Sequence, residues 1–268
     1  MPTADLGEVS IHYEEAGSGS PVLVYCHGLG GSGESFERDD MPWYAQHFRT
    51  ISWDNRGLGR SGQAQKYSLP KYAQDLNGLL DHLGVAQAVV LGVSWGGVVV
   101  QRFALDYPER CAAIVLDSTS SEVNPASAEN WYMRGEVVRL GAAAALAGRE
   151  MKPAFEGHVT MSEQRAVERT VPPEHVESYV AEARATAGLR EHPLTPYLHG
   201  INVPALVVGG GKDTVAGAGG SVVIARAMGD NARLEILQEA GHGVMHQARD
   251  EFRALLFEFL GDHGLQPS

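Results

Sequence analysis

The sequence predicts an α/β fold, namely a doubly wound, mostly parallel sheet that carries a helical insertion. Three observations support this fold class. Short β-branched runs alternate with helical stretches over residues 1–118 and again over 201–268. Several of these runs are continuously apolar, as strands buried on both faces of a parallel sheet are. Residues 119–200 contain no convincing strand and are rich in Ala, Glu and Arg.

Each strand is expected where β-branched and aromatic residues cluster between turn residues. The expected strands are Val9–Glu15, Val22–Cys26, Thr50–Trp53, Ala88–Val93, Ala112–Asp117, Ala205–Gly209 and Leu234–Leu237. Helices are expected between them at 34–47, 70–83, 95–106, 218–228 and 246–260. Strands that alternate with helices imply right-handed crossovers, and hence the doubly wound arrangement.

The middle of the chain is expected to be an insertion into one domain. Its helical stretches are 127–147, 161–170 and 173–187, and prolines at 153, 172 and 173 interrupt them. The α/β pattern resumes at Ile201, so the core is expected to comprise 1–118 and 201–268, and the insertion 119–200.

Composition restricts the function. The net charge of −12 opposes binding to nucleic acid and to anionic membranes. No apolar run approaches the roughly 18 residues of a membrane helix, and the N-terminus lacks a secretory signal, so a cytoplasmic protein is expected. Cys26 and Cys111 lie in apolar strand-like runs, where free buried thiols are expected. No Cys/His cluster has metal-ligand spacing, so neither metal nor cofactor is expected. The oligomeric state stays open.

The stretch from Val89 to Val98 predicts a nucleophile. An apolar strand runs into Gly92-Val93-Ser94-Trp95-Gly96 and then into a helix, which is the context of a nucleophile elbow. Such a turn exposes the serine hydroxyl above the carboxyl edge of the sheet and at the positive end of a helix. Ser94 is therefore the candidate nucleophile.

A serine hydroxyl needs a base. His242 is the strongest of eleven histidines, because it lies in a glycine-flanked loop between a strand and the last helix. His246 is the nearest rival, but it is expected to begin a helix and to point differently. His27 lies in another motif. The remaining histidines are expected at solvated or boundary positions: His12, His47, His82, His158, His175, His192, His199 and His263.

The base needs an orienting carboxylate. Asp213 follows the strand Ala205–Gly209 through a glycine run, and it precedes the unit that supplies His242. Asp117 and Asp54 end other strands and are the rivals. The order Ser94, Asp213, His242 is that of α/β-hydrolases and differs from the chymotrypsin and subtilisin orders.

These motifs resemble the α/β-hydrolase family over both core segments. Three further stretches carry the resemblance: His27-Gly28-Leu29-Gly30-Gly31 looks like the oxyanion loop, Asp54 to Gly62 like the D-x-R-G-x-G-x-S turn, and Val203 to Gly209 like the strand before the acid. The resemblance implies that the backbone N–H groups of Leu29 and Trp95 form the oxyanion hole and that the insertion is a helical cap. Arg56 and Arg60 are expected to anchor the turn.

The resemblance implies a serine hydrolase that cleaves a carboxylic ester or lactone, and a small, apolar substrate is expected. Meta-cleavage C–C hydrolases, cofactor-free perhydrolases, hydroxynitrile lyases and non-turnover ligand receptors of the same fold stay open. Gly243 stands where the C–C hydrolases usually carry Trp. In the insertion, Trp131, Tyr132, Met133 and Phe155 either face the substrate or form the core of the insertion.

Overall fold

A computed structural model describes residues 1–139 and 171–267. The described chain forms one eight-stranded sheet with the strand order β1-β2-β4-β3-β5-β6-β7-β8. The first two strands are antiparallel to their neighbours, and the other six are parallel. The predicted fold class is confirmed.

The strands follow the apolar runs closely. In chain order they are β1 (Thr3–Asp5), β2 (Ser10–Ala16), β3 (Val22–Cys26), β4 (Arg49–Trp53), β5 (Ala88–Val93), β6 (Cys111–Asp117), β7 (Ala205–Gly210) and β8 (Ala232–Leu237). All six residues of β5 and of β7 are buried, as expected of central parallel strands. Only β1 was not predicted from the sequence.

Helices cover both faces of the sheet, because the side chains of each strand alternate between the faces. Val24 packs into one hydrophobic cluster with residues of α3 (Leu69–His82), α4 (Trp95–Asp106) and α9 (Gly217–Met228). Leu23 packs into a second cluster with residues of α1 (Glu34–Asp39), α2 (Met41–Tyr44), α10 (Val244–Gln247) and α11 (Arg249–Asp262). Both cysteines are free and buried, as predicted.

Two predicted helices are each divided in two. The stretch 34–47 breaks at Asp40 (φ −122°), before the proline at the start of α2. The stretch 246–260 breaks at Ala248 (φ −123°, ψ 54°) between α10 and α11.

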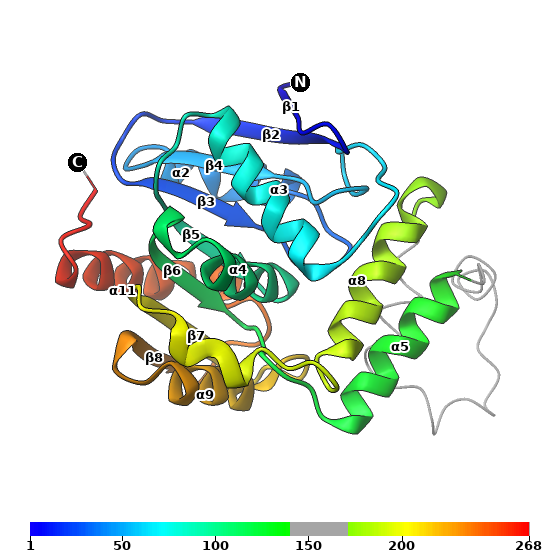
Figure 1. Cartoon of the computed structure of the whole chain (residues 1–268). Helices are drawn as coiled ribbons and strands as arrows, with labels where there is room; N and C mark the ends of the chain where they lie inside the picture. The colour runs from blue at the N-terminus through cyan, green and yellow to red at the C-terminus, as the bar shows by residue number, and fades with distance from the viewer. Residues whose placement is uncertain (140–170, 268) are drawn as a thin grey trace.

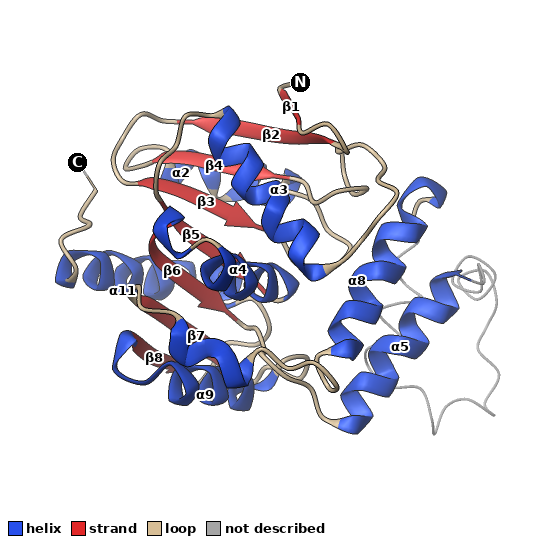
Figure 2. Cartoon of the chain, viewed as in Figure 1, coloured by secondary structure: helices blue, strands red, loops and turns tan. Residues whose placement is uncertain are grey.

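The insertion contributes α5 (Pro125–Arg139) and α8 (Val176–Gly188), which lie side by side beyond the carboxyl ends of the parallel strands (Figures 1 and 2). Short 3-10 helices, Pro173–His175 and Thr195–Gly200, precede and follow α8. The predicted helix 161–170 and the end of 127–147 lie outside the described residues. No helix of the described chain has the length and apolar character needed to cross a membrane.

Candidate active site

Ser94 occupies the sharp turn between β5 and α4. Its backbone has φ 55° and ψ −118°, a conformation that a non-glycine residue adopts only at an energetic cost. Two hydrogen bonds hold the turn: the Ser94 N–H donates to the Asp117 carbonyl at 2.9 Å, and the Thr119 hydroxyl donates to the Ser94 carbonyl at 2.6 Å. The predicted elbow is present.

The glycines around Ser94 allow strand and helix to pack at backbone distance. A Cβ at Gly92 would lie 2.4 Å from the carbonyl oxygen of Gly96. A Cβ at Gly96 would lie 2.1 Å from the carbonyl oxygen of Cys26. Neither contact is possible without movement of the main chain, so the Gly-x-Ser-x-Gly pattern has a steric cause here.

His242 and Asp213 meet, although 29 residues separate them in the chain. The His242 Nδ1 lies 3.0 Å from Asp213 Oδ2. The other carboxylate oxygen accepts the N–H groups of Val215, at 2.7 Å, and Ala216, at 3.1 Å. Burial alone would raise the pKa of Asp213, but His242 and these N–H groups hold the pKa below its ordinary value. The carboxylate is therefore ionised and its orientation is fixed.

The rival carboxylate Asp117 has a different position. It is fully buried at the end of β6, where its oxygens accept the N–H of Val244 at 3.1 Å and of Met245 at 2.9 Å. The hydroxyl of the neighbouring Ser118 accepts the Gly243 N–H of the same loop at 2.9 Å. Asp117 and Ser118 thus brace the loop that carries His242, a role that sequence analysis did not identify. Burial raises the pKa of Asp117.

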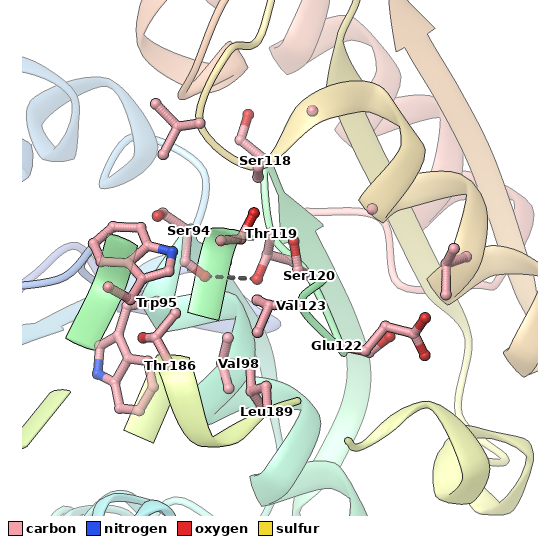
Figure 3. A pocket seen from close by; sticks show the side chains of 18 of the residues that line it. Ser94, Trp95, Val98, Ser118, Thr119, Ser120, Glu122, Val123, Thr186 and Leu189 are labelled. Carbon is pink, nitrogen blue, oxygen red and sulfur yellow. Dashed lines mark hydrogen bonds between the residues drawn. The ribbon is translucent and has the colours of Figure 1, made fainter. Parts of the chain in front are cut away.

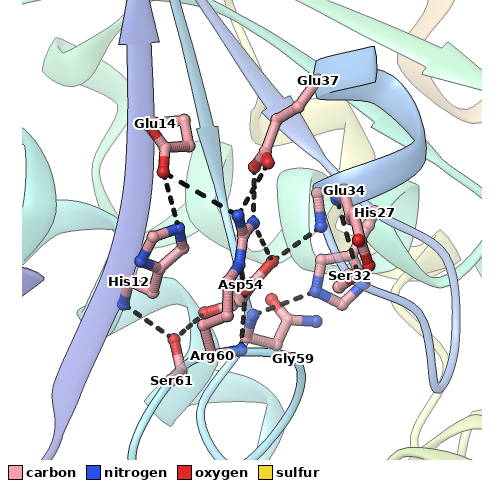
Figure 4. A network of polar contacts seen from close by, with 12 residues as sticks. His12, Glu14, His27, Ser32, Glu34, Glu37, Asp54, Gly59, Arg60 and Ser61 are labelled. Atoms are coloured by element: carbon pink, nitrogen blue, oxygen red, sulfur yellow. Dashed lines mark hydrogen bonds and ion pairs between the residues drawn. The ribbon is translucent and has the colours of Figure 1, made fainter. Parts of the chain in front are cut away.

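The second rival, Asp54, belongs to a separate polar network under the first loop (Figure 4). Its oxygens accept the Gly33 N–H at 2.7 Å and the Arg60 Nε at 2.9 Å, and Arg60 also pairs with Glu37. Arg56 donates twice to Asp75 at 2.6 Å. Both arginines anchor the turn, as expected.

His27 has a defined tautomer. Its Nε2 accepts the Asn55 N–H at 2.9 Å, so the ring proton is on Nδ1, which donates to the Gly28 carbonyl at 2.8 Å. Burial lowers the pKa of His27, which favours this neutral form. His27 therefore stabilises the loop that precedes Leu29.

Two further histidines lie beside carboxylates. The prediction for His12 was wrong: it is fully buried and lies 3.3 Å from Glu14, because β2 lies between β1 and β4. His246 lies in α10, as expected, and its Nδ1 pairs with Asp40 at 3.1 Å. His158 lies outside the described residues.

A cavity of about 830 Å³ opens over the elbow. Ser94, His242, Gly28 and Leu29 line it from the core, and α5 lines it from the insertion. A smaller cavity of about 350 Å³ adjoins it and shares Ser94 and Leu29 (Figure 3). A Cβ at Gly28 would lie 3.6 Å from the Ser94 Cβ, so the predicted oxyanion loop passes beside the serine.

The four large apolar residues singled out in the insertion have different positions. Trp131 lines both cavities. Tyr132 and Met133 are about half exposed, so they neither face the cavity nor form a core. Phe155 lies outside the described residues.

Glu182 on α8 was missed by sequence analysis. It is fully buried, and its oxygens accept the Gly30 N–H at 2.8 Å and the Asn55 amide at 2.9 Å. Burial raises its pKa to about 8, although these bonds and the Trp95 indole lower it. Glu182 thus joins the insertion to the loop of Leu29 and to Asn55.

Known proteins resemble most of this chain. A family model described as alpha/beta hydrolase fold matches residues 21–248. A 2-hydroxy-6-oxo-6-phenylhexa-2,4-dienoate hydrolase from Comamonas testosteroni is 28% identical, over 96% of this chain and 93% of its own. A 3-oxoadipate enol-lactonase from Acinetobacter baylyi is 27% identical, over 78% of each chain. The structure of the enol-lactonase from Burkholderia xenovorans superposes with a TM-score of 0.78 at 25% identity, covering 97% of this chain and all of the other.

Proposed function

Because this chain belongs to the alpha/beta hydrolase fold family, we propose that it is a serine hydrolase that cleaves a carboxylic ester or a lactone. One observation carries the proposal. The strained elbow presents Ser94 to the cavity that His242 also lines, while the other side of the His242 ring is held by Asp213. This is the arrangement that activates a hydroxyl for attack on a carbonyl.

Acylation is the first half of the reaction. The Ser94 hydroxyl oxygen attacks the carbonyl carbon while His242 accepts the hydroxyl proton at Nε2. The carbonyl oxygen becomes an oxyanion, which accepts hydrogen bonds from the backbone N–H groups of Leu29 and Trp95. The C–O bond then breaks, and His242 returns the proton to the leaving alkoxide. In a lactone, the resulting alcohol stays attached to the acyl group.

Deacylation repeats these steps with water. His242 takes a proton from water, whose oxygen attacks the acyl-enzyme, and then protonates Ser94 as the acid leaves. Asp213 is not protonated in this scheme. Its lowered pKa keeps it a carboxylate, which accepts a hydrogen bond from the Nδ1–H group and stabilises the imidazolium.

The substrate enters between core and insertion. We propose that residues 119–200 act as a cap, because α5 supplies one wall of the cavity that contains Ser94. The enol-lactonase relatives favour a lactone or ester substrate.

Ester turnover by Ser94→Ala tests the proposal. The parent is expected to hydrolyse p-nitrophenyl esters with multiple turnovers, and removal of the nucleophile is expected to lower kcat by about 10⁵–10⁶-fold. Asp230→Asn, an exposed carboxylate in a short 3-10 helix, is the control and should retain the parent rate. Activity of Ser94→Ala close to that of the parent would refute the assignment. A single turnover with tight retention of the ligand would favour a receptor.

Hydrolysis of a carbon–carbon bond is the second candidate. The relative from Comamonas testosteroni, which is named for a hydroxy-oxo-phenylhexadienoate, favours it. Gly243 after the histidine argues against it. Turnover of a vinylogous 1,5-diketone acid without turnover of any ester or lactone would decide for this candidate.

A further inference from the structure

Arg134 on α5 is a buried arginine in a protein of net charge −12. Only 9% of this residue is exposed to solvent. Its Nε donates to the hydroxyl of Tyr179 on α8. The guanidinium carbon lies 5.0 Å from the centroid of the Trp131 ring and 5.7 Å from that of Tyr179. Contacts from both helices of the insertion therefore fix its position.

No carboxylate neutralises this group within residues 1–139 and 171–267. The Nη1 and Nη2 groups make no hydrogen bond to the described chain, since Nε makes the one bond recorded for this side chain. A buried charge without a partner is costly, so a counter-charge is expected for Arg134, and a bound anion would supply one.

The position of Arg134 connects it to the candidate active site. It lines the 830 Å³ cavity together with Ser94 and His242. Ser127, Asn130 and Trp131 line the same cavity. Their spacing along α5, three or four residues apart, places them on one face of the helix with Arg134. This polar face of the insertion is thus turned toward the serine.

Other charged groups of the lining are already compensated or exposed. Arg38 is 67% exposed and pairs with Asp39, and His246 pairs with Asp40. Glu34 lies exposed in the first turn of α1. Among the lining residues that the structure describes, Arg134 is the buried cation that has no anionic partner.

We propose that Arg134 binds a carboxylate of the substrate, so that the preferred substrate is an ester or lactone whose acyl part carries a second, ionised carboxyl group. The planar fork of an arginine binds a carboxylate through two parallel N–H···O bonds, and the free Nη groups supply them. Trp131 offers an apolar surface to the carbon chain between the two ends. The inference rests on the proposed function, because Ser94 defines where the scissile bond lies.

Matched esters test the preference. The p-nitrophenyl monoesters of succinic, glutaric and adipic acid carry the free carboxylate, and p-nitrophenyl valerate is the neutral match of the glutaryl ester. The parent is expected to prefer at least one monoester by about 10-fold or more in kcat/KM. Arg134→Gln should lower that value by about 10- to 100-fold, the worth of a charge-assisted pair, and leave valerate within about twofold.

Two further variants are needed. One tests whether the planar fork of Arg134, and not its charge alone, binds the carboxylate, and the other is a control. Arg134→Lys keeps the charge but loses the fork, so it should lie between the parent and Arg134→Gln. Arg226→Gln removes an exposed cation of α9 that lines neither cavity, and it should leave both substrates within about twofold. An equal fall on the monoester and valerate, or a parent without preference for any monoester, would overturn the proposal.

A binding measurement keeps the inference separate from catalysis. Glutarate should raise the Tm of Ser94→Ala, should not raise that of the Ser94→Ala/Arg134→Gln double variant, and should do more than valerate. If the parent hydrolyses no ester but glutarate stabilises through Arg134, the hydrolase proposal fails and the carboxylate site stands. If valerate ester is hydrolysed and glutarate stabilises both variants equally, the carboxylate site fails and the hydrolase stands.

Discussion

The carboxyl group of Glu182 accepts the backbone N–H of Gly30 at 2.8 Å across the boundary between the insertion and the core. Gly30 follows Leu29, whose N–H we assign to the oxyanion hole. The second oxygen of Glu182 binds Asn55, and Asn55 in turn donates its backbone N–H to His27. Glu182, a buried side chain of α8, therefore holds the loop of residues 27–31 in two ways: directly at Gly30, and by way of Asn55 at His27.

The raised pKa of Glu182 gives folding stability a pH dependence. The folded pKa is about 8, whereas an exposed Glu titrates near 4.3. Between these values the unfolded chain has lost the proton and the folded chain has kept it. The free energy of unfolding therefore falls as pH rises through this window, and the contribution is complete only below about pH 4.

Glu182→Gln removes this titration while preserving the size of the side chain. We expect the free energy of unfolding of the variant, relative to that of the parent, to rise by at least about 1 kcal/mol from pH 5.5 to pH 8.5. Urea unfolding at several pH values measures the difference. Identical pH profiles of the two proteins would contradict the assignment. Glu177→Gln on the same helix is the control and should reproduce the parent profile.

Asp213→Asn tests the orientation of the base. An amide at this position can donate to Nδ1, which leaves the proton of the imidazole on Nε2, where it cannot accept from Ser94. We expect kcat to fall by about 10⁴-fold with little change in Tm. Steady-state kinetics on a neutral ester measure the effect. A variant that keeps more than about a tenth of the parent kcat would show that another group orients His242.

The sequence predicted the parallel sheet because burial on both faces leaves a continuous apolar run. The bounds of β3 and β5 agree with the expected ones to the residue. The Asp213–His242 contact was also anticipated, since both residues follow strands whose carboxyl ends lie at the same edge. Their catalytic roles, and those of Ser94, Leu29 and Trp95, stay predictions.

There is a physical reason why the buried charges of the insertion were not predicted from the sequence. Glu182 and Arg134 lie in helices rich in charged residues, where a buried charge is indistinguishable from an exposed one. Their burial depends on how α5 and α8 pack, and local pattern does not encode that packing. The break at Asp40 had a signal in Pro42, because proline favours the first turn of a helix and not its interior.

Gly96→Ala tests the steric argument for the elbow. The added methyl would lie 2.1 Å from the Cys26 carbonyl oxygen, which belongs to the neighbouring strand and cannot move alone. We expect a loss of about 2 kcal/mol or more in unfolding free energy, and a lower kcat because Ser94 shifts. Gly188→Ala, which meets no atom within 4 Å, is the control and should change stability by less than about 1 kcal/mol. Equal effects of the two substitutions would contradict the explanation.

Asp75→Ala tests whether the ion pair between Arg56 and Asp75 stabilises the turn of residues 54–62. Both side chains are almost completely buried, at 2% and 3% exposure, so removal of the carboxylate leaves a guanidinium without its counter-charge. We expect a loss of about 3–5 kcal/mol in unfolding free energy. Asp106→Ala breaks the partly exposed pair with Arg102 and should cost less than about 1 kcal/mol. Urea unfolding measures both variants.

The Asp75→Ala substitution should also affect activity, because Arg56 follows Asn55, which Glu182 holds. We expect Asp75→Ala to lower kcat/KM by more than the unfolded fraction explains, whereas Asp106→Ala should not.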